Sequence, residues 1–306
     1  MNIFVTGGTG FIGSHLINKL STKNNVVALV RDLFPTSTPW GKWLSEALGK
    51  ATIVLGDTLN LNLLKRILAE YEIDVVIHLA AQAIVRTAQK DPLGTFQTNI
   101  MGTANLLEAC RHIDVKTIYV QSTDKIYGER LSACEGDPLQ PTEPYATSKA
   151  CADLTAQTYM NTYNMPIIIG RACNTYGYDM ANRIIPNTIR SCLRGEPPII
   201  YEGEKTVRQY IYVSDLIDAI EFLIRRNEKG IWNIATDDIL TQEEVVKNIA
   251  KYFPLTPQLV KREKPIKEIQ KTTLNWSKLE NAGWQPKHTF DQAIQETIKK
   301  YEAYGF

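Results

Sequence analysis

The chain has 306 residues, of which 44% are hydrophobic and 22% charged, and these proportions are typical of a globular protein with one large domain and room for a smaller lobe. The formal net charge of +1 gives no electrostatic basis for binding nucleic acid or a membrane surface. Five widely spaced cysteines without a CxxC pair argue against a disulfide framework or a metal site and predict a reducing compartment. No apolar run approaches the ~20 residues that span a bilayer, and the chain enters a strand at once, so we expect a cytoplasmic protein.

Short apolar runs alternate with helical patterns over the first 172 residues. A long helix is expected around Asn99 to Ala109 and another at Ala146–Tyr163. The predicted strands are Ile3–Thr6, Val26–Val30, Thr52–Leu55, Val75–Leu79, Thr117–Val120 and Ile167–Gly170. This alternation predicts the α/β class, with a Rossmann-type, doubly wound parallel sheet covered on both faces by helices.

Beyond residue 172 prolines and glycines interrupt the pattern. Helices are expected at Ala181–Arg194, Ser214–Arg225, Gln242–Tyr252 and Phe290–Tyr301. We therefore predict a dinucleotide-binding domain over 1–172, with a returning segment near 208–235, and a smaller, mainly substrate-binding C-terminal lobe over 173–306. The run Lys261-Arg262-Glu263-Lys264 indicates a solvated face.

Four glycines lie between the first strand and the first helix. Gly7, Gly10 and Gly13 satisfy GxxGxxG, and Gly8, Gly10 and Gly13 satisfy GxGxxG. Glycine at these positions permits a tight turn, close approach of a pyrophosphate and packing of the helix on the strand, while the helix N-terminus offers N–H groups and partial positive charge. Because strand and helix flank the motif as it requires, the segment predicts a dinucleotide site.

The end of the second strand decides between NAD and NADP. An acidic residue there binds the ribose diol of NAD, whereas an arginine accommodates the 2′-phosphate of NADP. Arg31 precedes Asp32, which favours NADP and leaves NAD open; alternatively, Arg31 is a solvated strand-end residue. Asp57 is either a contact to the adenine edge or a helix cap.

Tyr145 and Lys149 are four residues apart and share one face of a helix that Pro144 begins. A neighbouring ammonium would stabilise the phenolate and lower the tyrosine pKa from ~10 toward neutrality. Tyr145 would then act as a general base for a sugar or alcohol hydroxyl. Thr123, just past a strand, can hydrogen-bond the same hydroxyl.

With these features the chain resembles the extended short-chain dehydrogenase/reductase family of nucleotide-sugar epimerases and dehydratases over nearly its whole length. The resemblance lies in Gly7–Gly13, His78–Ala81, Asn99 within Gln97–Thr103, Ser122 and Thr123, Tyr145 with Lys149, and Arg208–Val213. It implies that hydride leaves a sugar carbon, usually C4, while Tyr145 removes the hydroxyl proton and Thr123 positions that hydroxyl. It also implies a homodimer through helices near 95–111 and 146–163. The expected cofactor-binding residues are Gly7, Gly10, Phe11, Ile12, Gly13, Arg31, Asp57, Leu79, Ala80, Ala81, Asn99, Tyr145 and Lys149.

Asp124 and Lys125 narrow the choice within the family. The 4-epimerases carry no acid/base pair there, whereas the dTDP-glucose 4,6-dehydratases have Thr-Asp-Glu, in which Asp protonates the leaving 6-hydroxyl and Glu takes the C5 proton. The segment Thr123-Asp124-Lys125, with His78 to Arg86, looks most like the CDP-glucose 4,6-dehydratases. Lys125 would be the C5 base in its neutral form. Alternatively, Asp124 caps the following turn and Lys125 lies in solvent.

Several residues are expected near the substrate. By resemblance, Asn174 and Arg208 contact the nucleotide pyrophosphate, a task that suits the planar fork of arginine, and Gln82 and Arg86 join the substrate-binding residues. Arg183 is either near the nucleotide or a charge on a helix surface, and Tyr201 to Gly203 are candidates to lie along the base or ribose.

Three further side chains can be explained by structure alone. His78 is expected to be a hydrogen-bonded core residue, and Tyr127 and Tyr176 could either pack in the core or contact the sugar.

The predicted function is a nucleotide-sugar 4,6-dehydratase, with a sugar-nucleotide epimerase as the alternative and a non-catalytic dinucleotide-binding regulator as a third possibility.

Overall fold

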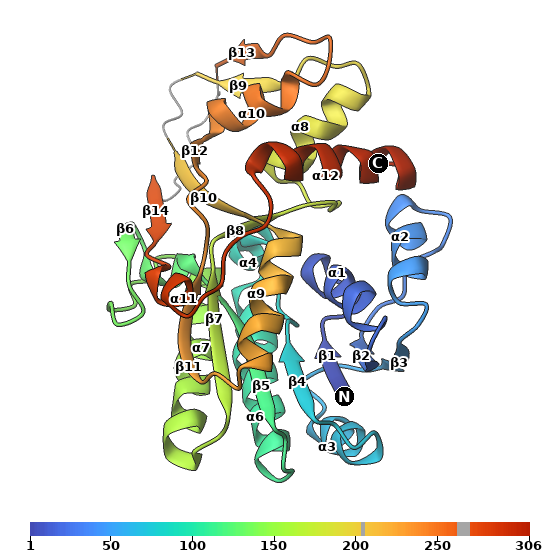
Figure 1. Cartoon of the computed structure of the whole chain (residues 1–306), viewed down its shortest axis with the longest axis vertical. Helices are drawn as coiled ribbons and strands as arrows, with labels where there is room; N and C mark the ends of the chain where they lie inside the picture. The colour runs from blue at the N-terminus through green and yellow to red at the C-terminus, as the bar shows by residue number, and fades with distance from the viewer. Residues whose placement is uncertain (203–205, 262–269) are drawn as a thin grey trace.

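The computed structural model describes residues 1–202, 206–261 and 270–306. A seven-stranded parallel sheet of order β11-β7-β5-β4-β1-β2-β3 forms the lower part of the molecule in Figure 1. Its strands are β1 (Asn2–Thr6), β2 (Asn25–Val30), β3 (Thr52–Leu55), β4 (Val75–His78), β5 (Thr117–Thr123), β7 (Ile167–Ala172) and β11 (Gly230–Ile234). The strand order reverses direction between β1 and β4, and ligands of doubly wound sheets bind outside the carboxyl ends of the strands at such a point. The predicted Rossmann-type sheet is confirmed.

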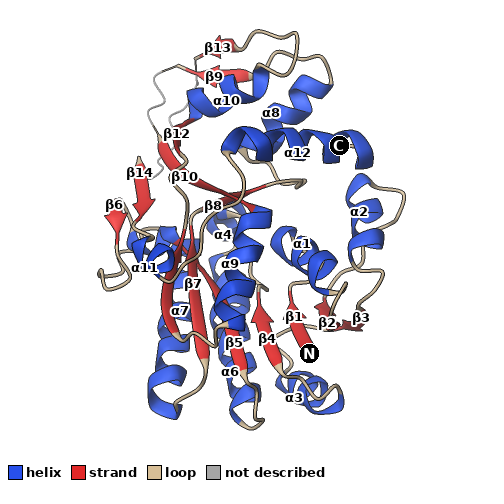
Figure 2. Cartoon of the chain, in the orientation of Figure 1, coloured by secondary structure: helices blue, strands red, loops and turns tan. Residues whose placement is uncertain are grey.

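Alternate strand residues point to opposite sides of the sheet, and both sides are buried except along the edge strand β3, where Ile53 and Leu55 are exposed. In β1, Ile3 and Val5 pack in one core with Leu16, whereas Phe4 packs in the other with Leu64. Figure 2 shows the helices on the two sides of the strands. The helices that supply residues to the first core include α1 (Phe11–Leu20), α2 (Pro39–Ala47) and α9 (Val213–Arg225), and those of the second are α3 (Leu61–Glu70), α6 (Gly102–Arg111) and α7 (Pro144–Tyr163). Burial on both faces explains why these strands read as continuous apolar runs.

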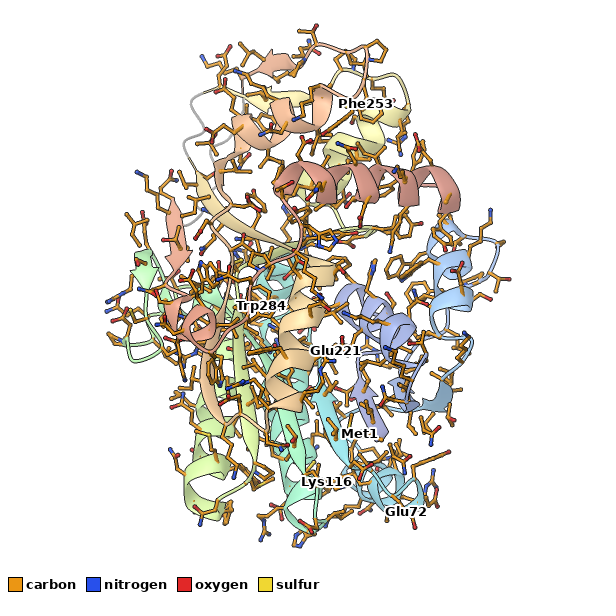
Figure 3. All side chains as sticks on the ribbon, viewed as in Figure 1. Met1, Glu72, Lys116, Glu221, Phe253 and Trp284 are labelled. Carbon is orange, nitrogen blue, oxygen red and sulfur yellow. The ribbon has the colours of Figure 1, made fainter. Side chains whose placement is uncertain are left out.

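The two ends of the sheet differ in what surrounds them. Met1 and Lys116, labelled in Figure 3, precede β1 and β5 and mark the amino ends of the strands. The other end faces a smaller upper part with one sheet of order β12-β10-β14-β6, in which β8 also pairs with β10, and a separate β9–β13 pair. Its elements are β6 (Arg130–Ala133), β8 (Asn174–Tyr176), α8 (Ile184–Leu193), β9 (Ile199–Tyr201), β10 (Val207–Tyr212), β12 (Ile239–Thr241), α10 (Gln242–Ala250), β13 (Gln258–Val260), β14 (Lys271–Leu274), α11 (Ser277–Asn281) and α12 (Phe290–Tyr304).

The C-terminal helix connects the two parts. Trp43 of α2 and Tyr304 of α12 stack edge to face with ring centroids 5.3 Å apart, and Trp43 also donates a hydrogen bond to Ser14 of α1. In the described ranges, no helix combines the length and the apolar character that a bilayer span requires.

Some expected elements differ from the observed ones. The helix expected at Ala181–Arg194 begins only at Ile184, because the Asp179 carboxylate accepts the Ala181 N–H at 2.9 Å and holds the preceding residues in a turn. The helix expected around Asn99 is interrupted. It begins as the π-helix η1 (Gln97–Met101) and continues as α6, and two short helices, α4 (Val85–Lys90) and α5 (Pro92–Phe96), precede it. The charge run at 261–264 and Gly203 lie outside the described residues, except for Lys261, which is exposed as expected.

Candidate functional site

The glycine turn after β1 has the backbone shape of a phosphate cradle. Gly7 has φ +76°, and a Cβ there would lie 2.8 Å from the backbone nitrogen of Ala80. A Cβ on Gly13 would overlap the carbonyl oxygen of Gly7, so glycine is required where α1 crosses the turn. Helix α1 has Gly10 as its N-cap and no side-chain cap, which leaves its first N–H groups available to an anion. These residues fit the pyrophosphate of a dinucleotide.

Arg31 and Asp32 follow β2 at the same edge of the sheet. The Arg31 Nε donates to the Asp32 carboxylate at 2.8 Å, and both side chains are 65% exposed. Asp57 accepts the backbone N–H of Leu59 at 2.9 Å, while Asn60 caps α3. The carboxylate of Asp57 thus belongs to a turn and not to the helix cap, and its contact to an adenine remains a prediction.

The segment after β4 is held in place by Asn99. Its amide donates to the Gln82 carbonyl at 3.1 Å and to the Ser148 hydroxyl at 2.8 Å, and its oxygen accepts the Gln82 N–H at 2.7 Å. Asn99 is buried in η1, and these contacts join Gln82 to Ser148 of α7. His78 bridges the hydroxyls of Thr6 and Thr103 at 2.7 and 2.9 Å, and burial lowers its pKa to about 3, so the expected core histidine is confirmed.

Tyr145 stands at the start of α7. The carboxylate of Glu143 accepts the N–H groups of Tyr145 and Ala146 at 2.9 and 2.7 Å, which caps the helix and fixes the direction of the tyrosine. Thr123, the last residue of β5, lies near the phenol, and its side chain acts to lower the pKa of Tyr145. Burial raises the pKa of this phenol well above its ordinary value.

Lys149 lies one turn along α7 and is buried. Its ammonium donates to the backbone oxygen of Gln121 at 2.5 Å, and burial lowers its pKa to about 8. The expectation that Lys149 brings the Tyr145 pKa toward neutrality is therefore wrong for this geometry. Burial dominates the phenol, and the lysine is directed at the end of β5.

Asp124 and Lys125 form the 3-10 turn η2 (Asp124–Tyr127), directly after β5. Asp124 is only 1% exposed, and its carboxylate accepts the Thr123 hydroxyl at 2.9 Å and faces the Asn174 amide at 3.5 Å. Thr123, and not Asp124, caps the turn by accepting the Lys125 N–H. Lys125 is half-buried. The alternative in which Asp124 caps the turn and Lys125 lies in solvent therefore does not describe this structure.

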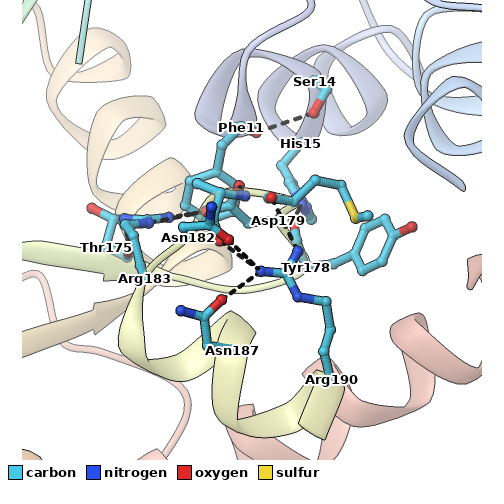
Figure 4. A network of polar contacts seen from close by, with 12 residues as sticks. Phe11, Ser14, His15, Thr175, Tyr178, Asp179, Asn182, Arg183, Asn187 and Arg190 are labelled. Carbon is cyan, nitrogen blue, oxygen red and sulfur yellow. Dashed lines mark hydrogen bonds and ion pairs between the residues drawn. The ribbon is translucent and has the colours of Figure 1, made fainter. Parts of the chain in front are cut away.

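Two arginines, Arg183 and Arg208, were expected near the nucleotide. Arg183, shown in Figure 4, pairs with Asp179, donates to the Thr175 carbonyl at 3.0 Å and lies over the Phe11 ring at 5.1 Å. It is thus tied to the glycine turn and is more than a helix-surface charge. Arg208 donates to the carbonyl oxygens of Val207 and Gln270.

The remaining residues that were expected near the substrate lie on several different elements. Arg86 is exposed on α4, Gln82 accepts the Ile84 N–H at 3.0 Å, and Tyr201 is half-buried on β9. Asn174 donates to the Gln209 carbonyl at 3.2 Å besides facing Asp124. For the two open tyrosines, Tyr176 packs among aromatic rings, and the Tyr127 hydroxyl bonds to Arg171 and Asn233, so packing is the observed role of both.

A buried ion pair behind the site was not anticipated from the sequence. Arg171 of β7 and Asp153 of α7 are 1% and 0% exposed and are joined by two hydrogen bonds, at 2.8 and 2.9 Å. Asp153 also accepts the Ser122 hydroxyl, and Arg171 donates to Tyr127 of η2. The sequence feature that could have indicated this pair is the single arginine in the otherwise apolar run of β7.

Comparisons with known proteins show the family to which the chain belongs. Residues 3–235 match the model of the NAD dependent epimerase/dehydratase family. A dTDP-D-glucose 4,6-dehydratase of Dictyostelium discoideum is 35% identical over 81% of this chain and 61% of its own length, and a dTDP-glucose 4,6-dehydratase of Haemophilus influenzae is 30% identical over 98% of both chains.

Solved structures of enzymes with two different activities, a 4,6-dehydratase and a 4-epimerase, share this fold. The dTDP-glucose 4,6-dehydratase DesIV of Streptomyces venezuelae, with NAD and TYD bound, has a TM-score of 0.87 at 28% identity and covers 99% of this chain and 97% of its own. The UDP-glucose 4-epimerase of Thermotoga maritima, with UDP-glucose, has a TM-score of 0.88 at 26% identity and covers 99% of both chains. The chain belongs to the NAD dependent epimerase/dehydratase family.

Proposed function

We propose that the chain is a nucleotide-sugar 4,6-dehydratase, which converts an NDP-hexose to an NDP-4-keto-6-deoxyhexose and water. The observation that carries the proposal is the turn after β5. It holds a buried carboxylate, Asp124, hydrogen-bonded to Thr123 and near Tyr145, with the amine of Lys125 on the following residue. Oxidation at C4 alone requires Tyr145 and Thr123, so this additional acid and amine favour elimination over simple epimerisation.

The cofactor in this proposal is a nicotinamide dinucleotide, whose role when bound is to take a hydride from the sugar and return it. Gly7, Gly10 and Gly13 would hold its pyrophosphate, and Arg31 and Asp32 lie at the position that selects between NAD and NADP. Relatives in the solved structures hold NAD, and the preference for NADP suggested by Arg31 stays a prediction. Arg31→Ala should weaken binding of NADP and leave that of NAD unchanged; equal effects on both, measured by calorimetry, would remove Arg31 from the choice.

In the proposed reaction, Tyr145, Lys125 and Asp124 each transfer one proton. Tyr145, once its phenol has lost its proton, takes the O4 proton as the C4 ketone forms, and the ketone makes the C5 proton acidic. The neutral amine of Lys125 then removes the C5 proton, and the protonated carboxyl of Asp124 gives its proton to O6 as the C6–O6 bond breaks and the C5–C6 double bond forms. Lys125 returns its proton to C5 as the hydride is returned to C6. Asp124 is 1% exposed, so bulk water is kept away from the acid.

The test is incubation with CDP-, UDP-, GDP- and dTDP-hexoses, followed by mass spectrometry. We expect one of these sugar nucleotides to lose one water. Lys125→Met should abolish the loss of water but still allow C4 oxidation, while the control Lys116→Met, which changes an exposed lysine at the opposite end of β5, should behave as wild type. A product of unchanged mass with inverted C4 would favour the epimerase, an activity that the Thermotoga neighbour makes a specific alternative. Tight dinucleotide binding without any turnover would favour the regulator.

We also propose a homodimer through the outer faces of α5, α6 and α7. Leu93 of α5, Met101 of η1 and Leu154 of α7 are exposed apolar side chains on these neighbouring helices. Exposed apolar residues that gather on adjacent helices are typical of protein–protein interfaces.

A further inference from the structure

One buried ion pair holds the turn η2 from both of its ends. Before the turn, the Ser122 hydroxyl of β5 donates to the Asp153 carboxylate at 2.7 Å. At the end of the turn, the Tyr127 hydroxyl accepts a hydrogen bond of 2.7 Å from Arg171 Nη1. Arg171 and Asp153 are joined to each other at 2.8 and 2.9 Å. Residues 123–126 therefore lie between two anchors that belong to the same ion pair.

Burial and geometry restrict the position of the Tyr127 side chain. The tyrosine is fully buried, and the guanidinium carbon of Arg171 lies 5.0 Å from the centre of its ring. Nε and Nη2 of Arg171 bind Asp153. Nη1 donates to Tyr127 and, at 2.9 Å, to the carbonyl oxygen of Glu135. Because a guanidinium is planar and rigid, its bonds to Asp153 fix the direction of its bond to Tyr127.

The same hydroxyl also joins the turn to the upper part of the molecule. Tyr127 donates to the side-chain oxygen of Asn233 of β11 at 2.9 Å, and Asn233 is fully buried. The amide of Asn233 donates to the carbonyl oxygens of Ala133 of β6 and of Asn275, at 2.8 and 2.9 Å. The end of η2 is thus fixed relative to both sheets.

We propose that Tyr127, Arg171 and Asp153 are positioning residues that hold η2 in place for the loss of water from the sugar. This inference deepens the proposed dehydratase function and rests on it. In that function Asp124 acts on O6 and Lys125 on C5, and both residues belong to η2. The three positioning residues act through this turn.

The residues that serve C4 oxidation are placed by other contacts. Tyr145 begins α7, and the Glu143 carboxylate accepts its N–H at 2.9 Å. Lys149 donates to the Gln121 carbonyl at 2.5 Å. Removing the hydroxyl of Tyr127 frees one end of η2 but leaves the aromatic ring, the ion pair and α7. C4 oxidation should therefore continue, while removal of the C5 proton and loss of water slow down. A side chain that only stabilised the fold would not separate these steps.

The first measurement compares wild type and Tyr127→Phe in a single turnover of whichever of CDP-, UDP-, GDP- or dTDP-glucose the wild type dehydrates. Absorbance follows the reduced nicotinamide, and mass spectrometry follows the loss of water. We expect loss of water to slow by about tenfold or more, because small displacements of reacting groups are costly. The reduced cofactor should form at the wild-type rate and accumulate.

The second measurement isolates the C5 proton. The 6-deoxy analogue of the same sugar nucleotide can be oxidised at C4 but has no 6-hydroxyl to lose, so in heavy water Lys125 can exchange the C5 proton for deuterium. Tyr127→Phe should slow deuterium incorporation at C5 but keep the rate of cofactor reduction. The control is Tyr178→Phe, which removes an equally buried hydroxyl that donates to the Gly305 carbonyl at 3.1 Å. This control should match wild type in both rates.

Equal slowing of cofactor reduction and loss of water in Tyr127→Phe, or unchanged loss of water, overturns the positioning role. Chemical denaturation of each variant shows whether it folds. Should Tyr127→Phe not fold, Ser122→Ala decides, because it frees the other end of the same segment and should slow loss of water more than cofactor reduction.

Failure of the positioning role and failure of the proposed function give different results. Loss of water by the wild type, combined with an unchanged ratio of the two rates in Tyr127→Phe, overturns the positioning role alone. If the wild type removes water from none of the four glucose nucleotides, the proposed function is wrong and the positioning role falls with it.

Discussion

The buried pair Arg171–Asp153 gives the sharpest quantitative prediction. The Asp153 carboxylate accepts hydrogen bonds from Arg171 Nε at 2.9 Å, Arg171 Nη2 at 2.8 Å, Ser122 at 2.7 Å and Gln157 at 2.7 Å. Asp153→Ala removes all four and leaves a guanidinium that is 1% exposed without its counter-ion. Removing one partner of a buried ion pair costs about 3–5 kcal/mol of the free energy of unfolding.

The assay is chemical denaturation with a double-mutant cycle. Arg171→Met together with Asp153→Ala should recover part of the loss, because no uncompensated charge then remains buried. The control is Glu70→Ala, which removes the partner of the exposed Arg66 on α3 and should cost no more than about 1 kcal/mol. If Asp153→Ala unfolds at the same denaturant concentration as wild type, or if the double variant is as unstable as the two single losses added together, the account of this pair is wrong.

Three further predictions concern the glycine turn, the lysine of α7 and the outer helices. Gly13→Ala should abolish dinucleotide binding, measured by calorimetry, because its Cβ would overlap the Gly7 carbonyl, whereas Gly136→Ala, where a Cβ meets nothing within 4 Å, should bind as wild type. The Lys149 pKa is lowered to about 8 in the folded chain, so the unfolded chain binds more protons above that value, and the stability that Lys149 contributes should rise by ~2 kcal/mol between pH 8 and pH 10. The difference in unfolding free energy between wild type and Lys149→Met should follow this slope, and a flat difference would show that the amine is not desolvated. Leu154→Asp should shift the protein from dimer to monomer in sedimentation, with Leu259→Asp, an exposed leucine on β13, as the matched control; a wild type that sediments as a monomer contradicts the proposed dimer.

The fold was largely readable from local sequence patterns. Apolar runs of four to six residues mark the buried parallel strands because both faces of each strand are covered, as with Val75–His78. The glycine turn was readable because a positive φ at Gly7 and the close approach at Gly13 exclude other residues. The π-helix at Gln97–Met101 was not readable, because local patterns do not show the contact that Asn99 makes with Ser148 in the folded chain.

The spacing of Tyr145 and Lys149 on one helix, and the adjacency of Asp124 and Lys125, follow from the sequence by itself, since helical periodicity and chain order act within a few residues. Tertiary structure alone decided the direction of the Lys149 ammonium, the raised pKa of Tyr145, and the meeting of Asp124 with Asn174 fifty residues later. The ion pair between Arg171 and Asp153 likewise exists only because β7 and α7 pack together. Desolvation and long-range hydrogen bonds depend on what covers a side chain, and what covers it here comes from distant parts of the chain.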